Sequence, residues 1–256
     1  MSLGPGGLSY MLPGALEAIN SAEIVVGYKV YLGLIADLIE GKEIISSGMR
    51  KEIERCQAAI EYASGGNRVV IVSSGDAGIY GMAGLIFDLC REQDIQISHE
   101  QKGSGEAVDF YIDVIPGVAA FNAAASLVGA PLMHDFAAIS LSDHLTPWQV
   151  IEKRLGAAAS ADFVIAIYNP RSNTRPHLLQ QAQQVLLTHR PPATPVAVVR
   201  RATRDGQWQC LTTLGEIPIA EVDMQTILIV GNSNTYLWKG WMVTPRGYLE
   251  KYNPRI

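Results

Sequence analysis

The sequence predicts an α/β protein with two α/β domains, the first built on a mostly parallel sheet and the second on a mixed sheet. Short apolar runs alternate with helical patterns through the first half of the chain, which is typical of right-handed βαβ units. Near the end, strand patterns at 196–200, 207–214 and 226–230 follow one another with few helices among them. A length of 256 residues suits one large or two medium domains. We therefore expect domains at 1–128 and 129–256.

The composition excludes several classes of protein. A net charge of −5 leaves no basic stripe to neutralise nucleic-acid phosphates. The cysteines Cys56, Cys90 and Cys210 are scattered without metal-ligand spacing, and no histidine pattern supplies one. The chain contains neither an apolar run long enough for a membrane span nor a secretory signal. We expect a cytoplasmic protein that binds no nucleic acid, membrane or metal.

One glycine-rich stretch is the most informative part of the chain. The β-branched run 69–72 predicts a buried strand, the segment 73–76 a tight turn, and the residues after it a helix. Ligands of open α/β sheets bind at such junctions. The turn matches neither phosphate-binding pattern, GxxxxGK[ST] or GxGxxG, and it carries Asp76 but no lysine or arginine. It suits a ligand with a positive centre and no phosphate; the alternative is a plain turn, because turns favour Gly and Asp.

The first half contains further elements in order. The loop Gly4-Pro5-Gly6-Gly7 is of a kind that normally follows a strand, yet only Met1-Ser2-Leu3 precede it. We expect that the first strand is missing or is replaced by these three residues. Patterns further along predict helices from Pro13, over 28–39, over 52–63 and over 118–125, and strands at 23–27, 44–45 and 110–115.

The second half starts with an expected strand at 137–141. Thr146 and Pro147 are expected as N-cap and first residue of a helix that reaches about residue 159. A buried strand at 163–168 and a helix over 175–189 follow, and Asp205-Gly206 is a hairpin signal.

Six motifs are spread over nearly the whole chain: GPG at 4–6, VGYKVY at 26–31, SSGDAGIYG at 73–81, VIPGVAAFNAAA at 114–125, HDFAAISLSDHLTPWQVIEKRL at 134–155 and YNPRS at 168–172. Together they resemble the tetrapyrrole methylase family, and within it the branch that methylates C17 of precorrin-3B in cobalamin biosynthesis.

The resemblance implies a homodimer in which S-adenosylmethionine binds in the cleft between the two domains and leaves as S-adenosylhomocysteine. It also implies methyl transfer to C17 of precorrin-3B coupled to ring contraction, giving precorrin-4. The family's cofactor contacts fall on Pro5, Ser74, Gly75, Asp76, Ile79, Ala119, Ala120, Leu141, Asn169, Ala202, Thr226 and Ile227. The missing first strand puts the Pro5 contact in question, and Ala119 lacks the hydroxyl of the threonine that many relatives carry there.

Catalytic and substrate-binding candidates follow from the chemistry. Methyl transfer needs positioning and exclusion of water more than covalent help, and no nucleophilic triad is visible. We assign Asp76 to the positive end of the cofactor or to proton handling, with an Asx turn as the alternative. Ser142 and Asp143, next to His144, are acid or base candidates for ring contraction, with helix capping as the alternative.

An acidic protein that binds a polycarboxylate needs local cations. Lys29 and Arg171 lie in matched motifs and are the candidates to bind the substrate carboxylates. The group Arg200, Arg201 and Arg204 is expected to be a mixture of a solvated edge and one substrate contact. Tyr28 is a candidate to stack on the macrocycle, and a core position is its alternative.

Three rival functions remain at this point. The cobalt-containing substrate, cobalt-precorrin-3 of the anaerobic route, shares these motifs. A non-catalytic tetrapyrrole-binding protein on the same fold is a second rival. A nucleotide-phosphate-binding protein is the third, and the acidic loop opposes it.

Overall fold

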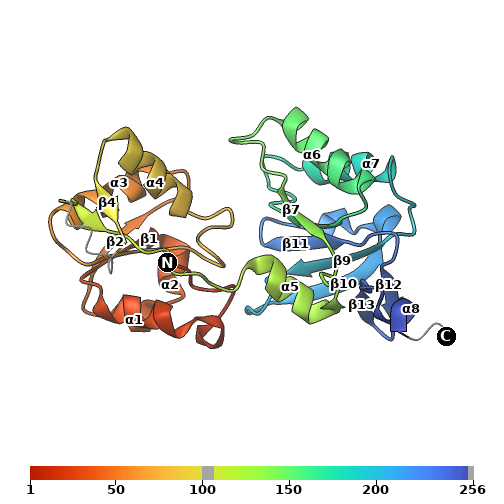
Figure 1. Ribbon diagram of the computed structural model, residues 1–256, viewed down its shortest axis with the longest axis horizontal. Coiled ribbons are helices and arrows are strands. Elements are labelled where there is room, and N and C mark those ends of the chain that lie inside the picture. Colours follow the sequence, from red (N-terminus) through yellow and green to blue (C-terminus); the bar gives the residue numbers. More distant parts are fainter. Residues whose placement is uncertain (100–106, 253–256) are drawn as a thin grey trace. The chain divides into compact units, whose positions relative to one another are not determined.

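A computed structural model describes residues 1–99 and 107–252 of the chain (Figure 1). The chain divides into two compact units, Met1–Ala120 and Phe121–Ile256. The sequence suggested a boundary after residue 128, at the end of helix α5 (Ala120–Val128), whereas this division falls at the start of the helix. Both units combine helices with a sheet, the first parallel and the second mixed, as the sequence predicted.

The sheet of the first unit is parallel and has the strand order β2-β1-β3. Its strands are β1 (Ile24–Tyr28), β2 (Glu43–Ser47) and β3 (Val69–Val72). Gly27 of β1 lies opposite Val72 of β3, so both strands end at the same edge of the sheet. A separate parallel pair is formed by β4 (Ile97–Ser98) and β5 (Phe110–Tyr111).

Helices cover both faces of this sheet. The first unit contains α1 (Pro13–Ser21), α2 (Lys29–Gly33), α3 (Glu52–Ser64), α4 (Ala83–Glu92) and the 3₁₀ turns η1 (Leu8–Tyr10) and η2 (Ala36–Leu38). Because successive strand residues point to opposite faces, Val25 packs in a cluster with α1, whereas Val26 packs in a cluster with α3 and α4. Cys56 and Cys90 belong to the second cluster and are buried, which confirms them as core residues.

The sheet of the second unit is mixed and has the order β10-β9-β11-β8-β7. Its strands are β7 (Phe136–Ser140), β8 (Val164–Tyr168), β9 (Pro195–Arg200), β10 (Trp208–Thr213) and β11 (Thr226–Val230). β7 and β8 are parallel, and β11 is antiparallel to both β8 and β9. The hairpin of β9 and β10 turns through Gly206, whose φ of +75° suits glycine.

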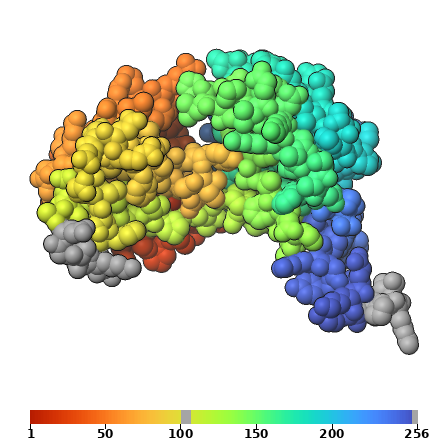
Figure 2. Space-filling view, turned by 45° about the horizontal axis from the view of Figure 1, so that its top comes forward, coloured from red at the N-terminus to blue at the C-terminus, as the bar shows by residue number. Residues whose placement is uncertain are grey.

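Helices α6 (Trp148–Ser160) and α7 (Leu178–Leu187) lie side by side on the surface of the second unit, green and blue-green in Figure 2. Their buried side chains share one apolar cluster with the sheet. Smaller elements complete the unit: β6 (Gly129–Ala130), η3 (Leu214–Glu216), η4 (Ile219–Glu221), β12 (Tyr236–Trp238), β13 (Trp241–Val243) and α8 (Tyr248–Tyr252). None of the helices among the described residues has the length and apolar content that a bilayer crossing requires.

Four local predictions were wrong. Pro147 itself is the N-cap of α6, and Thr146 does not cap it. The helix expected over 28–39 breaks after Gly33 into a turn and η2. The helix expected from Arg175 begins only at Leu178, because Pro176 disfavours a helical Arg175.

The fourth wrong prediction is the strand at 110–115. Only Phe110–Tyr111 pair in a ladder, because no strand lies beside residues 112–115 among the described residues. The expectation that Met1-Ser2-Leu3 replace a strand has a structural counterpart. Ser2 forms a parallel bridge with Ser73, so these residues extend alongside the end of β3.

Candidate functional site

Three glycine-containing loops meet at the end of β3 in the first unit. Gly4 and Gly75 exchange two backbone hydrogen bonds, with N···O distances of 3.1 and 2.7 Å. Gly75 has a φ of +65°, and a Cβ on Gly117 would lie 2.5 Å from the carbonyl oxygen of Gly75. Both positions therefore require glycine, the first for its conformation and the second for its space. The loops at residues 4, 75 and 117 form one contiguous backbone surface.

The carboxylate of Asp76 connects these loops through hydrogen bonds. Its Oδ1 accepts a hydrogen bond from the backbone N–H of Gly78 at 2.8 Å, which is the Asx-turn geometry that the sequence left as the alternative. Its Oδ2 accepts another from the backbone N–H of Gly117, also at 2.8 Å. A carboxylate has about four acceptor positions, so Asp76 keeps capacity for a further donor while it holds the loop.

The hydroxyl of Ser2 forms a second hydrogen-bonded connection between the loops. Its hydroxyl donates to the carbonyl oxygen of Ile115 at 2.7 Å and accepts from the N–H of Ala77 at 2.8 Å. The amino group of Met1, which is buried, donates to the carbonyl oxygen of Ile71 at 2.8 Å. Burial lowers the pKa of this amine to about 6, and the charge of Asp76 acts in the opposite direction.

The other predicted residues of the first unit lie along the same edge. Ser74, Ile79 and Ala120 are partly buried, whereas Pro5 and Ala119 are buried. Tyr28 is the last residue of β1 and Lys29 follows it, and the end of β1 lies beside the end of β3. The Tyr28 ring packs edge-on against Tyr31 at 5.2 Å, with the Arg55 guanidinium 5.9 Å from its centroid. The Tyr28 ring therefore already packs against other side chains and is partly buried, whereas Lys29 is exposed.

The predicted residues of the second unit gather at one edge of the five-stranded sheet. Leu141 follows β7 and Asn169 follows β8, and these strands are parallel neighbours. Thr226 starts β11 opposite Arg200, the last residue of β9, so Ala202 lies at this edge as well. Leu141 donates its N–H to the carbonyl oxygen of Tyr168 at 2.9 Å. Four strands distant in the sequence therefore end or begin at the same edge.

Several of these residues offer only backbone atoms. Leu141 and Thr226 are almost fully buried. The Thr226 hydroxyl donates a hydrogen bond to Oδ1 of Asp223 at 2.9 Å. Ala202 and Ile227 are also buried. Polar side chains that remain partly accessible at this edge are Asn169 and Ser142. Asn169 has a φ of +50° and donates from Nδ2 to the Ser140 hydroxyl at 2.9 Å.

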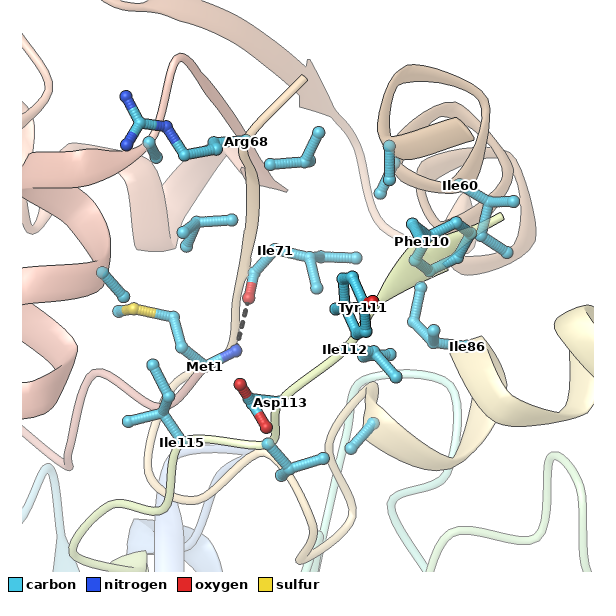
Figure 3. A pocket seen from close by; sticks show the side chains of 18 of the residues that line it. Met1, Ile60, Arg68, Ile71, Ile86, Phe110, Tyr111, Ile112, Asp113 and Ile115 are labelled. Carbon is cyan, nitrogen blue, oxygen red and sulfur yellow. Dashed lines mark hydrogen bonds between the residues drawn. The ribbon is translucent and has the colours of Figure 1, made fainter. Parts of the chain in front are cut away.

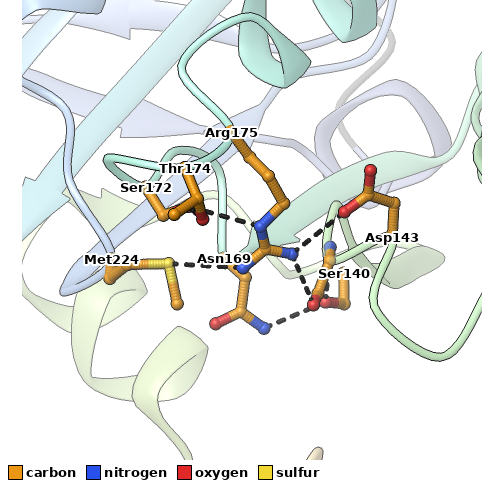
Figure 4. A network of polar contacts seen from close by, with 8 residues as sticks. Ser140, Asp143, Asn169, Ser172, Thr174, Arg175 and Met224 are labelled. Atoms are coloured by element: carbon orange, nitrogen blue, oxygen red, sulfur yellow. Dashed lines mark hydrogen bonds and ion pairs between the residues drawn. The ribbon is translucent and has the colours of Figure 1, made fainter.

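Arg175 is the organising residue that the sequence missed. Its Nη1 donates to the Ser142 hydroxyl at 2.7 Å and lies 3.3 Å from Oδ1 of Asp143 (Figure 4). Its Nε donates to the Ser172 hydroxyl at 3.3 Å. The guanidinium thus ties the loop after β7 to the loop after β8. The sequence did carry a signal: Pro176 directly after Arg175 places this arginine in a loop instead of a helix.

Arg171 has a structural use in this arrangement. Its Nη1 donates to the backbone carbonyl oxygens of Ile219, Ala220 and Val222, at 3.3, 3.2 and 3.2 Å. The substrate contact expected of Arg171 stays a prediction. Within residues 1–99 and 107–252, no group of three His, Cys, Asp or Glu side chains is placed to hold a metal ion.

Comparisons with known proteins identify the family. The model of the Tetrapyrrole (Corrin/Porphyrin) Methylases matches residues 1–218. A probable cobalt-factor III C(17)-methyltransferase of Salmonella typhimurium is 50% identical over 248 residues, which are 97% of this chain and 98% of that protein. A precorrin-3B C(17)-methyltransferase of a Sinorhizobium species is 39% identical over 91% of this chain and 87% of that protein. A cobalt-factor III methyltransferase of Priestia megaterium is 45% identical over 98% of this chain, but the chain spans only 45% of its length.

Solved structures agree with these relatives. The crystal structure of the methyltransferase CobJ matches with a TM-score of 0.83 and 36% identity, over 95% of this chain and 97% of that one. A uroporphyrin-III C-methyltransferase from Thermus thermophilus, solved in complex with S-adenyl homocysteine, shares the fold with a TM-score of 0.64 and 17% identity, over 90% of this chain and 95% of that one. The chain therefore belongs to the tetrapyrrole (corrin/porphyrin) methylases.

Proposed function

We propose that this chain transfers a methyl group from S-adenosylmethionine to C17 of a corrin precursor in cobalamin biosynthesis, with contraction of the ring. The observation that carries the proposal is the 50% identity to the Salmonella relative over nearly the whole of both chains. The glycine loops at the end of β3 also support the proposal. Asp76 holds them together, and residues 73–79 include no basic residue that would favour a phosphate.

The residues present fit a cationic cofactor without phosphates. Asp76 and the backbone carbonyls of its loop are acceptors, which suit the amino group and sulfonium of S-adenosylmethionine. A pyrophosphate would need the N–H donors and the lysine of a phosphate loop. We infer that Pro5, Ser74 to Asp76, Ile79, Ala119 and Ala120 of the first unit hold the cofactor. Leu141, Asn169, Ala202, Thr226 and Ile227 of the second unit supply the other contacts, four of them through the backbone.

The chemistry that the cofactor supplies when bound is an electrophilic methyl group, with S-adenosylhomocysteine as the leaving product. The protein contributes by holding the reacting atoms in line and by excluding water. Ser142 adds proton chemistry for ring contraction. The guanidinium of Arg175 occupies a lone pair of its oxygen and leaves the O–H free to donate. Because a positive charge beside the oxygen favours release of the proton, Ser142 acts as an acid and Asp143 as the partner that keeps Arg175 in place.

The metal state of the substrate is the finer part of the proposal. The Salmonella relative, named for cobalt-factor III, is 50% identical, and the Sinorhizobium relative, named for precorrin-3B, is 39% identical. This difference favours the cobalt-containing substrate over the metal-free one.

The test compares both substrates directly. The purified protein is incubated with S-adenosylmethionine and either cobalt-factor III or precorrin-3B, and the product mass is read for one added methyl group. We expect the methylated product faster with the cobalt form. Faster turnover of the metal-free form would reverse the substrate assignment. No mass change with either substrate, together with no S-adenosylhomocysteine binding in calorimetry, would leave a non-catalytic binding protein on this fold.

We also infer that two copies of the chain associate. Trp238 lies opposite Trp241 in the β12–β13 hairpin, and Tyr236 is two residues before Trp238 on the same strand, so the three side chains lie on one face. Their exposed fractions are 47% for Tyr236, 58% for Trp238 and 50% for Trp241. This hairpin is at the surface in Figure 2, in blue. Exposed clusters of aromatic side chains mark interaction sites. In light scattering, Trp238→Ser with Trp241→Ser should give monomers, whereas the control Met49→Ser, at an exposed site in the first unit, should stay dimeric. A monomeric wild type would refute the inference.

A further inference from the structure

The guanidinium of Arg175 has one nitrogen that the fold does not use fully. Nη1 donates to the Ser142 hydroxyl at 2.7 Å and lies 3.3 Å from Oδ1 of Asp143. Nε donates to the Ser172 hydroxyl at 3.3 Å. Nη2 contacts the sulfur of Met224 at 4.0 Å, and within residues 1–99 and 107–252 no oxygen acceptor is placed to receive its two N–H groups (Figure 4). Because a thioether sulfur is a weak acceptor, Nη2 keeps donor capacity for a ligand.

The position in front of Nη2 is accessible, and the guanidinium is held in a fixed orientation. The Arg175 side chain is 20% exposed, and Met224 beside it is 41% exposed. In Figure 4, Met224 lies on the opposite side of the guanidinium from Asp143, so the acidic partner and the open nitrogen are on different sides. Because Ser142, Asp143 and Ser172 already hold the guanidinium, a ligand at Nη2 binds a group that needs little further ordering.

The arginines that the sequence suggested as substrate contacts are engaged with the protein. Arg171 donates from Nη1 to three backbone carbonyl oxygens, at 3.2 to 3.3 Å. Arg201 donates from Nε to Oε1 of Gln225 at 2.6 Å, and the Arg200 guanidinium lies 5.8 Å from the centroid of the Trp208 ring. The open guanidinium nitrogen described above thus belongs to an arginine that the sequence did not single out.

We propose that Nη2 of Arg175 is a subsite for one carboxylate of the macrocyclic substrate. The inference rests on the function proposed above, whose substrate is a corrin precursor with several carboxylates. The charge of the guanidinium selects an anion, because hydrogen bonds between a charged donor and a carboxylate are about twice as strong as neutral ones. One guanidinium then serves two carboxylates: Asp143 contacts Nη1, and the substrate binds Nη2.

The place of Ser142 favours the macrocycle over the cofactor, which also carries a carboxylate. The Ser142 hydroxyl is the proposed acid for ring contraction, and it accepts from Nη1 of the same planar group at 2.7 Å. A macrocycle within reach of this hydroxyl is therefore within reach of Nη2 through one of its side chains. A carboxylate bound there fixes one side of the macrocycle beside the acid, which is how positioning contributes to catalysis.

The test measures binding of the macrocycle apart from the reaction. Absorbance titration of cobalt-factor III gives its Kd with S-adenosylhomocysteine present, so that no methyl transfer occurs. Arg175→Lys keeps the positive charge but has a single nitrogen in place of the planar fork. Met224→Glu places a carboxylate opposite Nη2, where it competes with the substrate. We expect each variant to raise the Kd of the macrocycle about tenfold or more.

Two controls separate charge at the subsite from other effects. Met224→Gln has the length of glutamate without its charge, and we expect a smaller rise in Kd than with Met224→Glu. Met133→Glu makes the same change at a residue that is 48% exposed and precedes β7, at the opposite end of this strand from Ser142. Its Kd for the macrocycle should stay within about twofold of the wild type. Calorimetry with S-adenosylhomocysteine is run on every variant.

The outcomes that contradict the subsite differ from those that contradict the proposed function. An unchanged Kd in Met224→Glu, or an equal rise in Met224→Gln, would overturn the subsite. Weaker binding of S-adenosylhomocysteine in Met224→Glu, with the macrocycle Kd unchanged, would assign the carboxylate to the cofactor instead. A wild type that binds the macrocycle without methylating it would refute the proposed function, and the same titrations would still decide on the subsite. A wild type that binds no macrocycle would overturn both.

Discussion

Replacing Arg175 by alanine tests how the second unit holds its candidate acid. The change removes the Nη1 bond to the Ser142 hydroxyl, at 2.7 Å, and the 3.3 Å contacts with Asp143 and Ser172. Hydrogen bonds to charged groups are worth about 1.5–3 kcal/mol each, but the Asp143 side chain is 35% exposed, so its ion pair contributes under about 1 kcal/mol. We expect the free energy of unfolding to fall by about 2 kcal/mol.

The activity should change in a characteristic way. Without the guanidinium, the loop with Ser142 is no longer tied to the loop with Ser172, so kcat should fall by about tenfold to a hundredfold. Affinity for S-adenosylhomocysteine should stay within about twofold, because Asp76 and Asn169, the side chains that we propose to contact it, are unchanged. Arg175→Lys should restore part of the stability, since lysine keeps the charge without the planar fork.

Steady-state kinetics, calorimetry and denaturant unfolding check these expectations. The matched control is Arg154→Ala, at an exposed position on α6. If Arg175→Ala behaves like the control, with unchanged kcat and a free energy of unfolding within about 0.5 kcal/mol of the wild type, then Arg175 does not position Ser142.

Three further predictions concern the first unit and the thiols. Asp76→Asn should lower the free energy of unfolding, measured with denaturant, by about 1.5–3 kcal/mol, since an amide oxygen cannot serve both backbone N–H groups. It should also weaken S-adenosylhomocysteine binding in calorimetry. Unchanged values would contradict the role of the Asp76 charge. The Met1 amine has a pKa of about 6 when folded and 8.0 unfolded, so the unfolded state holds more protons between pH 6 and 8. The free energy of unfolding should rise by about 2–3 kcal/mol across this window, and N-acetylation should abolish the rise. Burial raises the pKa of the Cys56 thiol to about 12 and also raises that of Cys90. A thiol reagent should therefore label Cys210 first, as read by mass spectrometry. Labelling of Cys56 first would refute this prediction.

The buried strands and long helices could be read from local patterns. The β-branched run at 69–72 became β3 with the same bounds, and the pattern over 52–63 became α3 with one residue more. Such elements depend on the period of their own apolar residues. The prediction for 110–115 was wrong because a strand needs a neighbour to pair with, and a run of apolar residues does not reveal whether one is present.

The site was predictable in its loops but not in its contacts. Asp76, Ser142 and Asn169 each follow a strand, and the structure places each at the end of one. Oδ2 of Asp76 accepts from Gly117, 41 positions away, and Arg171 binds carbonyl oxygens 48 to 51 positions away, so neither contact could be read from the local sequence.

The sequence by itself determined the family, the alternation of strands and helices, and an acidic glycine loop without a phosphate-binding lysine. Local periodicity and the chemistry of single residues are enough for these. The tertiary structure alone decided that Arg175 ties Ser142 to the loop after β8, and that β3 and the segment from Phe110 to Ile115 line one cavity (Figure 3). Both depend on which distant segments the folded backbone brings within hydrogen-bond reach, and no local pattern encodes that distance.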